Sequence, residues 1–213
     1  MFRVCPLEQQ GGIMRGSVSI TADGLTIRLL IFLILLLAIA TALPGCKKET
    51  EQARKYMRQG NRAFGAALAM GSELRNTKDG PIVSLASGDT GIISQVASRL
   101  KEIKLQVLRY RRMVGIAERY YKDISELSGV GEYIEYQIII LKAVENEKEI
   151  ASLWSSLLRK SSDALERIAR GEQVDWGSQA KEAQAALEKI ERLASESAEI
   201  EKEALRLRKE KDL

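Results

Sequence analysis

The chain has 213 residues, with 33 lysines and arginines against 29 aspartates and glutamates, a formal net charge of +4. It contains no histidine and two cysteines. Without histidine, a Ser-His-Asp triad and histidine metal sites are excluded. The nearly balanced charge, spread along the chain, argues against a nucleic-acid-binding surface. We therefore expect neither a metal centre nor a nucleic-acid partner.

An uncharged apolar run near the N-terminus governs the interpretation of everything that follows it. The run is Leu29–Leu43, with Arg28 in front of it. These fifteen residues would span about 22 Å as a helix, at ~1.5 Å per residue. A bilayer core of roughly 30 Å requires about 20 apolar residues. The run is short for a permanent span and suits the apolar core of a signal peptide. Because Met14 gives such a signal a more usual start, we interpret residues 1–13 as an extension of the reading frame.

The four residues Leu43-Pro44-Gly45-Cys46 follow directly. They resemble the lipobox of bacterial lipoproteins, which has an aliphatic residue, a variable one, a small one and a cysteine. Pro44 stands where alanine, serine or threonine is usual. The resemblance implies that the Cys46 sulfur receives a diacylglyceryl group and that cleavage makes Cys46 the new N-terminus. It also implies outer-membrane sorting in organisms with two membranes, because Lys47 rather than aspartate follows the cysteine.

Two other fates of the same segment stay open. Ala40-Thr41-Ala42 matches the A-x-A pattern of ordinary signal peptidase sites, which would release a soluble protein starting at Leu43. The segment could also remain uncut as a short N-terminal anchor. All three place the rest of the chain outside the cytoplasm. We expect a leader and signal peptide at 1–45 and a single domain at 46–213, which has one cysteine and hence no internal disulfide.

Behind Cys46, apolar and small residues recur at alternating steps of three and four, which is the heptad pattern of helices that pack against one another. The strictest repeat lies between Ile93 and Ile124. We expect four helices and one long loop, at about 49–75, 92–127, 132–170 and 178–210, with the loop at 76–91. Gly129 can take the left-handed conformation that ends a helix, and Asp175 or Ser178 can cap the fourth helix.

The short connections at 128–131 and 171–177 force neighbouring helices to be antiparallel. The sequence therefore predicts an all-α fold, an elongated up-down-up-down four-helix bundle or antiparallel coiled coil behind an N-terminal signal segment. The second choice is a three-helix coiled coil with a loose first helix.

A run of five polar residues, Glu145-Asn146-Glu147-Lys148-Glu149, covers every face of the third helix, and Glu147 falls where the heptad expects an apolar side chain. Folding the chain about residue 130 places this run opposite three arginines. We predict a polar belt of glutamate–arginine pairs between the second and third helices, formed by Glu145, Glu147, Glu149, Arg109, Arg111 and Arg112. Such a belt is either a salt-bridge cluster that is solvated or fixes register, or a site for an ion or small polar ligand.

The loop at 76–91 contains Ile82, Val83 and Leu85 in a polar context, so it either docks an envelope protein or closes the end of the bundle. No catalytic constellation is present, and we expect no enzyme. The expected function is that of a lipoprotein of the cell envelope, held on the extracytoplasmic side by fatty acyl groups such as palmitate on Cys46. Its bundle would act as a structural or protein-interaction module. The alternatives are a ligand-sensing bundle centred on Glu147 and, third, an envelope-acting enzyme.

Overall fold

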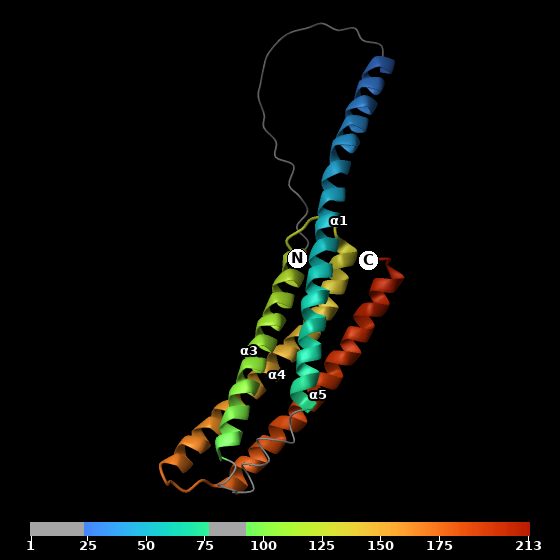
Figure 1. Ribbon diagram of the computed structural model, residues 1–213. Helices are drawn as coiled ribbons and strands as arrows, with labels where there is room; N and C mark the ends of the chain where they lie inside the picture. The colour runs from blue at the N-terminus through green and yellow to red at the C-terminus, as the bar shows by residue number, and fades with distance from the viewer. Residues whose placement is uncertain (1–23, 77–92) are drawn as a thin grey trace. The chain divides into compact units, whose positions relative to one another are not determined.

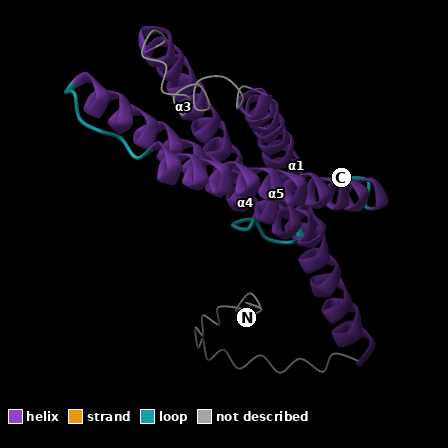
Figure 2. Ribbon diagram, turned by 90° about the horizontal axis from the view of Figure 1, so that it is seen from below, coloured by secondary structure: helices purple, strands orange, loops and turns teal. Residues whose placement is uncertain are grey.

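The computed structural model describes the backbone of residues 24–76 and 93–213, and the side chains of 47–76 and 95–213. Its helices are α1 Gly24–Asn76, α3 Ile93–Ile124, α4 Gly131–Ala169 and α5 Trp176–Glu210 (Figure 1). Figure 2 shows these helices in purple and the described loops in teal, and the described ranges contain no strand. The side chains of the lipobox-like motif and the loop residues 77–91 lie outside the described part.

The chain divides into two compact units, residues 1–43 and 44–213. The second unit is the predicted all-α four-helix bundle. α1 begins at Gly24 and not near residue 49, because the leucine-rich run before Cys46 is itself helix-forming and continues into the first bundle helix. None of the helices, over the residues described, has an apolar stretch long enough to cross a membrane.

Neighbouring helices of the bundle run in opposite directions. Glu182, early in α5, pairs with Lys160, late in α4. Lys211, just beyond α5, comes within 3.9 Å of Glu135, early in α4. The start of α5 thus contacts the end of α4 and the end of α5 contacts the start of α4, so the two helices are antiparallel, as the short connection between them requires.

The heptad positions face one shared core. In α3 the residues of the heptad repeat from residue 96 onward are all buried: Val96, Leu100, Ile103, Val107, Tyr110, Val114, Ala117, Tyr121 and Ile124. α4 buries fourteen residues on two faces, whereas α5 buries four, so α4 is the central helix of the bundle. α1 adds Ala53, Phe64 and Leu74 to the same core, and the three-helix alternative with a loose first helix is therefore wrong.

Three local features fix how the helices meet. Gly129 has a φ of +68°, the predicted left-handed conformation, and Asp175 caps α5 by accepting a hydrogen bond from the Ser178 N–H at 3.1 Å. Gly60 lets α1 approach α3 closely, because a Cβ at this position would lie 2.6 Å from the Tyr121 ring.

Candidate functional site

Glu147 of α4 forms the most unusual polar centre of the bundle, since its side chain is 0% exposed. The Tyr110 hydroxyl, from α3, donates to Glu147 Oε2 and also lies 3.0 Å from the Glu147 carbonyl oxygen. The other carboxyl oxygen, Oε1, is buried and has no hydrogen-bond partner among the described residues. An unpaired buried polar atom of this kind is rare in folded proteins.

The two remaining helices complete the centre. From α5, the Ser197 hydroxyl donates to the Ala143 carbonyl oxygen at 3.4 Å and also approaches the Glu147 carboxyl. From α1, Gly71 brings the backbone close to the Glu147 carboxyl. A Cβ added at this glycine would lie 3.4 Å from Arg75 Nη1 and 3.6 Å from Glu147 Oε2. Arg75 Nη1 is buried and, within the described part, also lacks a hydrogen-bond partner. We call this set, Arg75, Tyr110, Glu147 and Ser197, the Glu147 centre.

The electrostatics of the centre follow from its burial. Burial raises the pKa of the Glu147 carboxyl, while the hydrogen bond from Tyr110, the nearby Ser197 hydroxyl and the charge of Arg75 partly oppose that rise. Burial, the Glu147 charge and the shared hydrogen bond raise the pKa of Tyr110. Tyr110 therefore stays a hydrogen-bond donor, and Glu147 keeps its proton to a higher pH than an exposed glutamate. The free Oε1 can accept from an N–H group or face a cation.

The predicted polar belt takes a different form. Tyr110, not an arginine, meets Glu147, because Tyr110 lies on the inward seam of α3 and its arginine neighbours point outward. Glu145 pairs with Lys148, and Glu149 pairs with Lys189 of α5. The expected glutamate–arginine pairs do not form within the described ranges, where the three arginines, Arg109, Arg111 and Arg112, are exposed.

A second polar cluster lies closer to the end of the bundle where the described side chains begin. The hydroxyls of Tyr121 and Tyr136 both donate to Asn61 Oδ1, each at 2.7 Å. A cavity of about 70 Å³ adjoins them and is also lined by Glu201 and Arg208. Burial, followed by the charge of Glu147, raises the pKa of Glu201.

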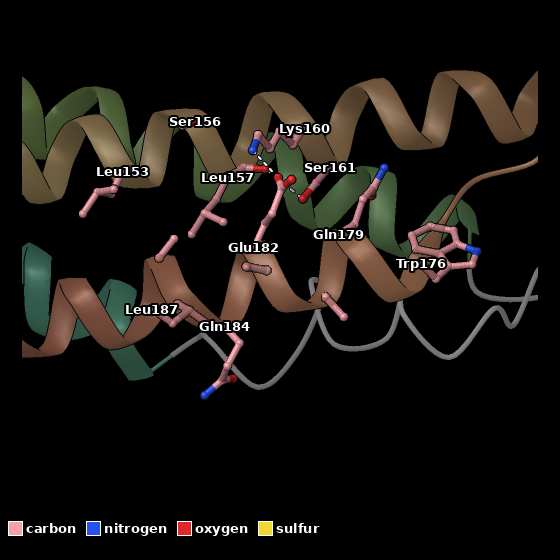
Figure 3. Close-up of a pocket in the computed structure, with 13 residues that line it drawn as sticks. Leu153, Ser156, Leu157, Lys160, Ser161, Trp176, Gln179, Glu182, Gln184 and Leu187 are labelled. Atoms are coloured by element: carbon pink, nitrogen blue, oxygen red, sulfur yellow. Dashed lines mark hydrogen bonds and ion pairs between the residues drawn. The ribbon is translucent and has the colours of Figure 1, made fainter.

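An open groove of about 400 Å³ runs between α4 and α5 (Figure 3). Its floor is apolar, with Leu153 and Leu157 from α4 facing Ala183 and Leu187 from α5. Trp176 lies at the start of α5, at one end of the groove. No group of three acidic, cysteine or histidine side chains in the described part is arranged to hold a metal ion.

The sequence predicted Glu147 as a candidate site residue, because a glutamate stands there at a heptad position that expects an apolar side chain. It did not predict the residues that contact Glu147. Tyr110 and Ser197 looked like ordinary seam positions, and Arg75 and Gly71 carry no signal of their own. No protein-family model, curated protein or solved structure matches the chain.

Proposed function

We propose that this chain is a membrane-anchored extracytoplasmic lipoprotein whose bundle serves as a structural or protein-interaction module of the cell envelope. The observation that carries the proposal is the Leu43–Cys46 motif directly after an uncharged run. The lipid on Cys46 holds the bundle at the membrane, and the helices behind it need no disulfide to be stable.

The organisation of the chain supports this proposal. The compact unit that holds the bundle begins at Pro44, within the motif and two residues before Cys46. Its buried core is built from its own four helices, with hydrophobic residues from Ala53 to Ala204. Cleavage before Cys46 would leave that core intact and would leave the outer faces of the helices available to partners.

Metabolic labelling with a fatty acid tests the proposed lipid attachment at Cys46. Wild-type protein is expected to take up the label and to fractionate with membranes, whereas Cys46→Ser takes up none. Equal labelling of the two proteins contradicts the lipoprotein proposal. Crosslinking followed by pull-down from solubilised envelopes tests the proposed protein-interaction role of the bundle. The bundle should retain a stable protein partner.

A second function is favoured by one specific observation: Glu147 Oε1 and Arg75 Nη1 are both buried without hydrogen-bond partners in the described part. This pair of atoms suits a small polar ligand with an ammonium or N–H group for the carboxyl and an acceptor for the guanidinium. Binding would stabilise the folded state by about 2.7 kcal/mol at a ligand concentration 100 times Kd, and this stabilisation would raise the melting temperature. Ammonium and glycine are suitable probes, and a thermal shift that survives in Glu147→Leu would rule the centre out as the site.

A further inference from the structure

The outward face of α3 carries a concentration of positive charge. Residues 101–119 contain six lysines and arginines and two glutamates. Steps of three, four and seven residues place a stripe on one side of the helix: Lys101, Leu105, Leu108, Arg112 and Arg119. Leu105 is 57% exposed and Leu108 is 55% exposed. We call this stripe, with its flanking Lys104, Arg109 and Arg111, the basic face of α3.

The acidic residues of this segment are already neutralised by partners. Glu102 pairs with Arg99 at 3.3 Å, and Glu118 pairs with Lys122 and Lys148 at 2.7 and 3.2 Å. The lysines and arginines of the basic face form no ion pair with any residue of the described ranges. Within the described part of the chain, the face therefore presents positive charge without an ion-pair partner around two exposed leucines.

The basic face also begins near the point of attachment. The Ser128 N–H, in the turn after α3, donates to the Glu49 carboxylate at 2.7 Å. The Arg119 end of the face thus lies at the same end of the bundle as residues 47–49, which directly follow Cys46. From there the face extends about 27 Å along α3, at ~1.5 Å per residue.

We propose that the basic face of α3 docks onto the anionic lipid surface of the membrane that holds the chain. The inference rests on the proposed lipid attachment, which keeps the bundle close to that surface. Lysines and arginines are attracted to anionic head groups, and exposed leucines reach the boundary between head groups and acyl chains. A second copy of the chain fits less well, because the most acidic stretch of α5, residues 196–203, holds only four glutamates beside Lys202, and one of them, Glu196, already lies 3.9 Å from Arg192.

The test uses the processed protein, purified from membranes and reconstituted into vesicles. In that form acylation occupies Cys46 and cleavage has removed Cys5, so Leu108→Cys supplies the free thiol for a polarity-sensitive fluorophore. The matched control is Ile138→Cys on α4, where the native side chain is equally exposed at 55%. Vesicles of phosphatidylcholine alone are compared with vesicles in which part of it is replaced by phosphatidylglycerol.

The label at residue 108 should move to a less polar environment only in the anionic vesicles, and the label at residue 138 should not respond. Each basic contact favours docking by about fivefold, so Lys101→Gln/Arg112→Gln should lower the docked-to-free ratio by about 25-fold. Lys142→Gln/Arg159→Gln, which removes the same charge from α4, should leave the ratio unchanged.

Equal responses at residues 108 and 138, or none at 108, would overturn the docking proposal. A response at 108 to polyglutamate but not to anionic vesicles would overturn it in favour of an acidic protein partner. Mass spectrometry of the labelled protein separates these results from a failure of the lipid attachment, since an unacylated Cys46 would itself take up the fluorophore.

Discussion

Removing the Tyr110 hydroxyl should expose how much the bundle depends on satisfying Glu147. Tyr110→Phe leaves the buried ring in place and opens no cavity, but it takes away the hydrogen bond to Glu147 Oε2. Because Oε1 already lacks a partner among the described residues, both carboxyl oxygens would then be buried and unpaired. Above the raised pKa of Glu147 the carboxyl is charged, and a hydrogen bond to a charged group contributes about 1.5–3 kcal/mol, so we expect a loss of that size there.

The converse change should cost much less. Glu147→Leu removes the buried carboxyl, and the Tyr110 hydroxyl keeps an acceptor, the carbonyl oxygen of residue 147 at 3.0 Å. A buried carboxyl with one unpaired oxygen costs free energy, so its removal offsets the hydrogen bond that is lost with it. We expect Glu147→Leu to match or exceed the wild-type free energy of unfolding, and the double variant to resemble Glu147→Leu alone.

Urea unfolding of the four proteins provides the double-mutant cycle, with an expected coupling of about 1.5–3 kcal/mol. Additive effects, or a loss below about 0.5 kcal/mol for Tyr110→Phe, would refute the view that this hydrogen bond compensates for the buried carboxyl.

Three further predictions concern the core and its titration. Val107→Asp should lower the free energy of unfolding by about 3–5 kcal/mol, because it buries an unpaired charge, and a wild-type melting temperature would contradict the seam assignment. Gly60→Ala should destabilise the bundle by about 1–3 kcal/mol through overpacking against Tyr121, whereas Gly65→Ala, which has open space around it, should gain up to about 1 kcal/mol in urea unfolding. The pKa of Glu147 is raised in the folded state. At a pH above the ordinary glutamate pKa, the folded protein therefore binds more protons than the unfolded chain, and the free energy of unfolding should fall as pH rises through the raised pKa. Glu147→Gln should flatten that fall in unfolding titrations, and an unchanged slope would contradict it.

The fold was largely predictable because its determinants are local. The heptad rhythm of α3 specifies an inward face without reference to any other helix, and the glycine and aspartate at 129 and 175 mark helix ends by their own conformational chemistry. The start of α1 was not predicted, since the helix runs through the apolar segment that was interpreted separately as a signal.

The Glu147 centre was predictable only in part. A glutamate on an apolar seam is visible in the sequence, but its partner depends on the register between α3 and α4. Folding the chain about residue 130 correctly places the polar run of α4 opposite the turn of α3 that contains Tyr110. In that turn, however, the arginines flank Tyr110, and Tyr110 is the residue that faces inward. Arg75 and Ser197 come from α1 and α5, and the axial register of these two helices against α4 is set by tertiary packing.

Mass spectrometry of the N-terminal peptide of membrane-purified protein tests the central claim most directly. We expect a peptide that begins at Cys46 and carries the added mass of a diacylglyceryl group. A peptide that begins at Leu43, or one that still contains residues 29–43 without lipid, would contradict it.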